Sequence, residues 1–144
     1  MNISIQILKI MGLKIAEKLV EKSLDPEIRI WRGVISMALE DVLITNQNRT
    51  ESVLKGEAHD WFCNDSEDFK FVCNQADLEP KYVRLRYLNA LEDGKIKFTQ
   101  RQHLNIKYTK EYEKLRKAKN KEERKRFFKN IEELRKAISV CPWG

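Results

Sequence analysis

Apolar residues recur along most of the chain with the three- and four-residue spacing of α-helices. Residues 3–22 carry an apolar stripe with lysines outside it, which predicts an amphipathic helix. Residues 27–45 have the densest apolar face, and Asp25 and Pro26 before them are typical helix-start residues. We expect this second helix to bury six residues: Trp31, Val34, Ile35, Ala38, Leu39 and Val42.

A third helix is predicted over residues 51–62, with Leu54, Ala58, Trp61 and Phe62 facing inward. Gly56 lies within it, and the missing side chain favours close approach of a neighbouring segment. These helices and the next two are expected to form a compact bundle around five residues: Trp31, Trp61, Phe62, Phe69 and Val83.

Residues 66–91 predict two short helices joined by a tight turn. Asp65 or Ser66 caps the first helix, Pro80 suits the first turn of the second, and Asp93-Gly94 ends it. The first helix is expected to bury Phe69, Val72, Cys73 and Ala76, and the second Val83, Tyr87, Ala90 and Leu91. Lys81, Arg84 and Asn89 then face solvent.

The residues around this turn have the spacing of a helix-turn-helix. Cys73 is small enough for the two helices to cross closely, and Asp77 tolerates the left-handed conformation that the turn needs. Leu78 and Val83 then hold the second helix across the first. Glycine is more usual than Asp77 in this motif, and Arg86 occupies a usually apolar position. A plain helical hairpin therefore remains the alternative.

In residues 95–104 apolar and polar residues alternate over part of the segment. This pattern predicts either a short extended arm or a connector. Residues 106–138 predict helix, broken near Asn120, with two apolar stripes that need partners. This part either folds back on the bundle or pairs with its copy in another subunit. The chain is thus expected to be all-α, with an N-terminal helix at 1–24, a helix-turn-helix bundle at 25–94 and a basic helical extension at 95–144.

Positive charge is concentrated in the last third of the chain. The formal charge of the whole chain is +6, and residues 93–144 alone carry 16 Lys and Arg against 7 Asp and Glu, a net charge of +9. The run at 114–129 suits nucleic-acid phosphates, because each cation that contacts a phosphate releases counterions. A solvated helix face with ion pairs is the alternative.

Double-stranded DNA is the partner that the motif and the charge together favour. The second helix of the motif would enter the major groove, where Arg84 is the best candidate for bridging two acceptors on guanine. Arg86 is either structural or a phosphate contact. The full set of expected DNA-binding residues is Lys81, Arg84, Arg86, Asn89, Lys117, Lys121, Arg124 and Lys125. We also expect a homo-oligomer.

The remaining patterns indicate neither an enzyme nor a membrane protein. Phosphate-binding and catalytic-triad motifs are absent from the sequence, and no cofactor or small-molecule substrate is inferred. His59, Cys63 and Cys73 have a spacing that permits metal binding but lack a fourth ligand. Three cysteines without a paired motif fit the cytoplasm, and neither a signal peptide nor a membrane span is predicted.

Three segments, WRGVISMALEDVL (residues 31–43), HDWF (59–62) and SEDFKFVCNQADLEPKYVR (66–84), carry a family resemblance. Together they resemble a family of helix-turn-helix proteins carried by prophages and phage-like elements, and more broadly small terminase subunits. This resemblance implies DNA binding, for packaging of phage DNA or for transcriptional regulation. The alternative is a non-enzymatic helical scaffold whose basic helix binds an acidic protein or RNA.

Overall fold

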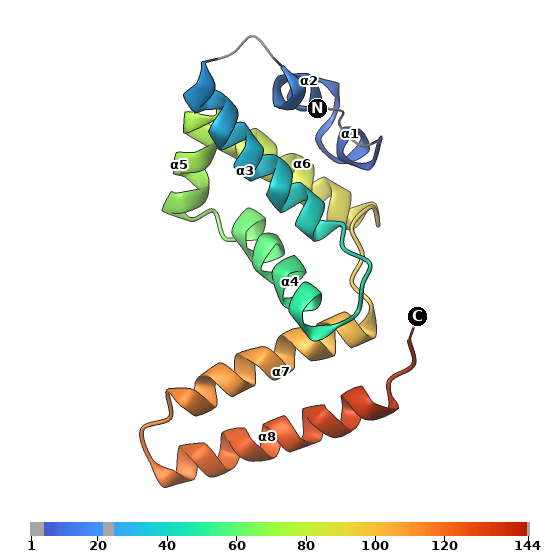
Figure 1. Cartoon of the computed structure of the whole chain (residues 1–144), viewed down its shortest axis with the longest axis vertical. Coiled ribbons are helices and arrows are strands. Elements are labelled where there is room, and N and C mark those ends of the chain that lie inside the picture. The colour runs from blue at the N-terminus through green and yellow to red at the C-terminus, as the bar shows by residue number, and fades with distance from the viewer. Residues whose placement is uncertain (1–4, 22–24, 144) are drawn as a thin grey trace. The chain divides into compact units, whose positions relative to one another are not determined.

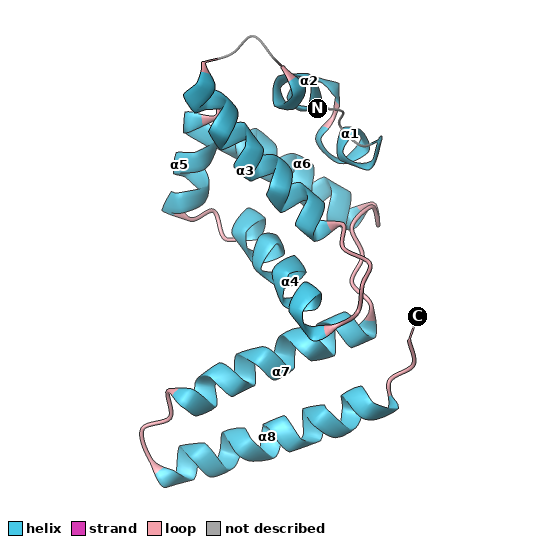
Figure 2. Cartoon of the chain, in the orientation of Figure 1, coloured by secondary structure: helices cyan, strands magenta, loops and turns pink. Residues whose placement is uncertain are grey.

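The computed structural model describes residues 5–21 and 25–143, and this part of the chain forms eight α-helices (Figures 1 and 2). The predicted all-α class is confirmed, since no described residue lies in a strand. The chain divides into two units, Met1–Ile44 with Glu57–Lys97, and Thr45–Gly56 with Phe98–Gly144. The N-terminal helices share a unit with α3 (Pro26–Val42), α5 (Glu67–Gln75) and α6 (Pro80–Glu92).

The predicted N-terminal helix is two helices, α1 (Ile5–Met11) and α2 (Leu13–Val20). Gly12 separates them with a φ of 83°, a conformation that favours glycine. The apolar stripe itself is confirmed, with Ile7, Met11, Ile15 and Leu19 buried. The ends of the predicted helix, residues 3–4 and 22, lie outside the described residues.

Helix α3 (Pro26–Val42) begins as predicted, because the Asp25 side chain accepts a hydrogen bond from the Glu27 backbone N–H. Its predicted inner face was partly wrong. Val34 is exposed and Trp31 and Ala38 are only half-buried, whereas the buried residues are Arg32, Ile35, Ser36, Leu39 and Val42. Arg32 can lie on the inner side of the helix because its guanidinium donates hydrogen bonds to the Ala76 and Lys18 carbonyls.

Three buried aromatic rings form the centre of the first unit, between α4 (Arg49–Cys63), α5 (Glu67–Gln75) and α6 (Pro80–Glu92). The ring of Phe62 stacks on that of Tyr87 at 4.4 Å between centroids, and Phe69 meets Phe62 edge-on at 6.0 Å. Of the five predicted core residues, Phe62, Phe69 and Val83 are fully buried, whereas Trp31 and Trp61 are half-buried.

The second unit is a helical hairpin of α7 (Gln100–Arg116) and α8 (Lys121–Val140), together with residues 45–56. The break near Asn120 is confirmed, since Asn120 caps α8. Residues 95–99 form a connection without helix or strand, and α7 starts earlier than the expected residue 106 because Thr99 and Gln102 form a capping box. The two predicted stripes pack on each other, with Tyr108 and Ile131 buried.

Polar side chains fasten the start of α7 to residues 46–55 within this second unit. Lys55 Nζ donates to Gln102 Oε1 at 3.1 Å, and Gln102 Nε2 donates to the Asn46 carbonyl at 3.1 Å. Asn105 Nδ2 donates to the Gln47 carbonyl at 2.9 Å. Lys55 and Gln102 are buried, whereas Leu54, which was expected to face inward, is exposed.

Candidate nucleic-acid interface

The two helices α5 and α6 and the tight turn between them are present as predicted. The backbone N–H of Leu78 donates to the Cys73 carbonyl at 2.9 Å, and that of Asp77 donates to the Asn74 carbonyl at 3.1 Å. This is the Schellman pattern at a helix C-terminus, in which the residue after the cap is left-handed. That residue is Asp77, with a φ of 57°. Cys73 and Leu78 are buried beneath the turn.

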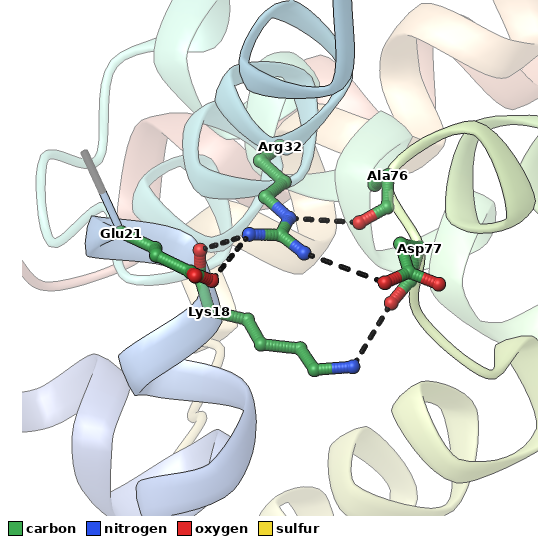
Figure 3. Close-up of polar contacts among 5 residues, drawn as sticks. All are labelled: Lys18, Glu21, Arg32, Ala76 and Asp77. Atoms are coloured by element: carbon green, nitrogen blue, oxygen red, sulfur yellow. Dashed lines mark hydrogen bonds and ion pairs between the residues drawn. The ribbon is translucent and has the colours of Figure 1, made fainter. Parts of the chain in front are cut away.

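Arg32 holds this turn from the side of α3 (Figure 3). Its side chain is 3% exposed, its Nε donates to the Ala76 carbonyl at 2.8 Å, and its Nη1 donates to the Lys18 carbonyl at 2.7 Å. The same Nη1 pairs with Glu21 Oε2 at 3.2 Å. A cation is favourable here because the carbonyls at the ends of α2 and α5 carry partial negative charge.

Lys18 of α2 makes a second link to the turn, since its Nζ donates to the Asp77 carbonyl at 3.2 Å (Figure 3). The Asp77 carboxylate lies 4.0 Å from Arg32 Nη2. The turn is therefore fixed by side chains from α2 and α3 as well as by its own backbone. Sequence reasoning missed this role of Arg32 and Lys18, because their acceptors are distant in sequence.

The open face of α6 carries a mixed set of side chains. Lys81, Leu85 and Asn89 are exposed at successive four-residue steps, so they share one face of the helix. Tyr82 is exposed beside them. This face offers a cation, an apolar contact and an amide, in agreement with the predicted exposure of Lys81 and Asn89.

Arg84 does not face solvent as expected. It is half-buried, and its Nε and Nη2 donate to the Cys63 carbonyl at 3.1 and 3.0 Å. Cys63 is the last residue of α4, whose terminal carbonyls need donors. Arg84 therefore caps α4 and positions it against α6.

Arg86 lies against the N-terminal helices. Its Nη2 donates to the Lys9 carbonyl at 3.5 Å and lies 3.1 Å from the place where a Cβ on Gly12 would be. Glycine at position 12 thus leaves room for this guanidinium. The Nε of Arg86 is buried without a hydrogen-bond partner among the described residues. Of the two roles open for Arg86, this contact matches the structural one.

Helix α7 and its C-cap residue carry a stripe of four exposed lysines, Lys107, Lys110, Lys114 and Lys117. Their spacing of three, four and three residues places them on one face of the helix. Part of this stripe lines a hollow of about 480 Å³ between α7 and α8, with Glu111 and Asn130. Burial acts to raise the pKa of Glu111, but hydrogen bonds from Lys114 and Asn130 outweigh it and lower that pKa.

The other predicted phosphate contacts lie at the turn of the hairpin. Lys117 is the C-cap of α7, Lys121 begins α8, and both are exposed together with Arg124 and Lys125. The eight predicted residues therefore fall in two groups, four on α6 in the first unit and four at the hairpin turn in the second. Lys107, Lys110 and Lys114 were missing from the prediction, although their helical spacing marks them in the sequence.

Two thiols, Cys63 and Cys73, and the His59 side chain lie in the first unit. Burial raises the pKa of Cys73 to about 12, so this thiol is protonated at neutral pH. His59 Nδ1 and the Tyr87 hydroxyl are 2.8 Å apart, and Cys63 Sγ is 3.8 Å from His59 Nε2. Among the described residues no three His, Cys, Asp or Glu side chains are placed to share a metal ion.

Comparison of the chain with protein-family models, curated proteins and solved structures gives no match. In the described part of the chain, none of the helices combines the length and the apolar character needed to cross a membrane.

Proposed function

We propose that this protein binds double-stranded DNA, with α6 in the major groove and the α7–α8 hairpin on backbone phosphates. The observation that carries the proposal is the α5–α6 turn with its left-handed Asp77, buttressed by Arg32, in front of an exposed face on α6. Helix-turn-helix proteins read base edges from the N-terminal part of such a second helix.

The open face of α6 has suitable chemistry for base edges. Lys81 can donate to guanine acceptors, Leu85 can contact a thymine methyl group, and Asn89 can make two hydrogen bonds to adenine. In this proposal Arg84 supports α6 and does not contact a base, because its Nε and Nη2 donate to the Cys63 carbonyl.

The lysines of α7 supply the sequence-independent part of the binding. Four cations on one face suit a row of phosphates, and Lys121, Arg124 and Lys125 extend the positive surface at the hairpin turn. On its own this stripe also suits an acidic protein or RNA, which is the competing function. The resemblance to phage-type proteins would make the DNA that of a mobile element, for packaging or for regulation.

The proposal is tested on the full chain by selecting the duplexes that it binds from a random pool. Fragments of the mobile element that carries the gene are added to the pool. We expect one motif to be enriched, and Lys81→Ala, at the N-terminal end of α6, to flatten the preference at one position by about 1–3 kcal/mol. Retention of all duplexes alike, with stronger binding to RNA or to an acidic peptide, would overturn it.

Salt dependence distinguishes the contribution of the α7 lysines to DNA binding from that of the α6 face. Replacing Lys107, Lys110, Lys114 and Lys117 by Ala is expected to weaken every duplex and to reduce the slope of log affinity against log salt by roughly 3 to 4. The matched control replaces the same four residues by Arg, which keeps the charge and the slope. An unchanged slope in the Ala variant would remove α7 from the interface.

A further inference from the structure

Helix α3 carries an apolar face that is exposed to solvent. Ile30 and Met37 are each 66% exposed and Val34 is 37% exposed, and they are spaced at four and three residues along one side of the helix. Gly33 lies among them, and a Cβ added there would meet no atom within 4 Å. Another helix can therefore approach this face closely.

Charges of opposite sign lie along one edge of this face. Arg29 and Glu40 are eleven residues apart, about three helical turns, so both lie on the same edge. Neither forms an ion pair with another described residue.

These charges are placed against the preference of the helix itself. The N-terminal end of a helix favours acids and the C-terminal end favours cations. Arg29 lies near the N-terminal end of α3, whereas Glu40 and Asp41 lie in its last turn, which contains no basic residue. A partner with the reverse arrangement would relieve both ends.

We propose that this face pairs with the same face of a second copy, with the two α3 helices antiparallel about a two-fold axis near Gly33. In an isologous pair of this kind each contact occurs twice. Arg29 then meets the partner's Glu40, and Ile30 packs near the partner's Met37. The acidic end of each α3 lies beside the N-terminal end of the other.

A second copy fits because the face is complementary to itself. A parallel two-fold pair would instead keep Arg29 and the partner's Glu40 at different heights along the helices, so neither charge would meet its opposite. The apolar area continues beyond α3 to Phe71, which is 51% exposed and meets the Trp31 ring at 5.4 Å between centroids. The pair thus has an apolar centre and charged ends, as protein interfaces commonly do.

Charge reversal tests this geometry by sedimentation of the full chain without nucleic acid, so the result does not depend on DNA binding. Arg29→Glu and Glu40→Arg are each expected to weaken the dimer about tenfold or more, because each places like charges together twice. An equal mixture of the two variants is expected to restore a dimer that contains one of each. The double variant R29E/E40R is expected to restore the homodimer.

Rescue in the mixture cannot arise within one chain, because positions 29 and 40 are about 16 Å apart along the helix. Both side chains are exposed, so circular dichroism is expected to show the same fold in all variants. The control is Arg124→Glu on α8, which makes the same change of charge at an exposed position of the other unit. At about 100 µM protein, a dimer with a Kd near 1 µM is mostly associated. A wild type that is monomeric at this concentration would overturn the proposal. So would a dimer that only Arg124→Glu weakens, or a mixture that stays monomeric.

Discussion

Between α5 and α6 the first unit fully buries aromatic rings, Phe69 and Tyr87 among them, whereas the helices of the second unit bury most of their apolar side chains only in part. Of the described apolar side chains of α7 and α8, Tyr108 and Ile131 are buried, and polar Gln102 and Asn105 are buried beside them. Apolar burial dominates folding free energy in most proteins. The second unit therefore depends more on hydrogen bonds between side chains and backbone.

The same comparison separates the two kinds of candidate binding surface. In the first unit Arg32 and Lys18 hold the α5–α6 turn, so the face of α6 is presented in one fixed orientation. In the second unit the lysines of α7 are exposed and long, which suits phosphates, whose recognition needs charge more than exact placement.

The largest effect is expected from Arg32→Met, which removes the donor to the Ala76 and Lys18 carbonyls. Each hydrogen bond to a charged group contributes roughly 1.5–3 kcal/mol, so we expect a loss of about 3 kcal/mol or more in the free energy of unfolding. Urea unfolding followed by circular dichroism measures it. Lys14→Met, at an exposed position of α2, is the control and is expected to change stability by less than about 0.5 kcal/mol. Equal effects of the two variants would show that the turn does not need the guanidinium.

The second unit is tested through Gly56, where an added Cβ would lie 2.9 Å from Ile106 Cδ1. We expect Gly56→Ala to lower the free energy of unfolding by about 1–3 kcal/mol, because the neighbouring side chain must shift. Gly33→Ala is the matched change in open space, and in dilute protein it is expected to raise stability by roughly 0.5–1 kcal/mol. Adding Ile106→Val to Gly56→Ala should recover part of the loss. No recovery would place the strain elsewhere.

Features set by neighbouring residues were predicted from the sequence. The cap at Ser66, the left-handed Asp77 and the turn at Gly94 each depend on a few adjacent residues, and all three are confirmed. Gly56 was also predicted correctly, because a glycine within an apolar helix face indicates close packing. These local signals were sufficient to place α5 and α6.

Features set by distant partners were not predicted. From the sequence alone an arginine is expected to face solvent. Arg32 is buried nevertheless, because the carbonyls of residues 18 and 76 accept hydrogen bonds from its guanidinium. The positions of the Arg84 and Arg86 side chains likewise depend on distant acceptors, the carbonyls of Cys63 and Lys9. For the candidate interface, sequence placed Lys81 and Asn89 correctly on the open face but not Arg84.

The turn of the first unit gives a smaller prediction. Asp77 is left-handed, a conformation that costs most residues 1–2 kcal/mol and glycine almost nothing. Asp77→Gly is therefore expected to raise stability by about 0.5–1 kcal/mol, since the exposed carboxylate lies 4.0 Å from Arg32 and contributes little. Asp77→Val is the opposite change and should destabilise. Thermal unfolding of both variants decides the point, and a stabilising valine would contradict the assigned conformation.

The smallest effect concerns pH and the end of α3. Burial, and then the charge of Glu40, raise the pKa of Asp41 above its ordinary value. The folded protein therefore holds this proton more tightly than the unfolded chain, so the contribution to stability is complete below the unfolded pKa and is lost as pH rises through the folded one. Asp41→Asn is expected to add roughly 0.3–1 kcal/mol at neutral pH, because it removes an acid from the negative end of the helix.

Unfolding of wild type and Asp41→Asn by urea at pH 4 and pH 7 measures this difference, in dilute protein so that any dimer is dissociated. The two stabilities should converge as pH falls, because protonated Asp41 is neutral like asparagine. Glu111, whose pKa is lowered in the second unit, has the opposite sign, so its contribution is lost as pH falls. Mild acid should thus stabilise the C-terminal end of α3, while it weakens the hydrogen bond between Asn130 and Glu111. A difference between wild type and Asp41→Asn that grows toward pH 4 would reverse the sign assigned to Asp41.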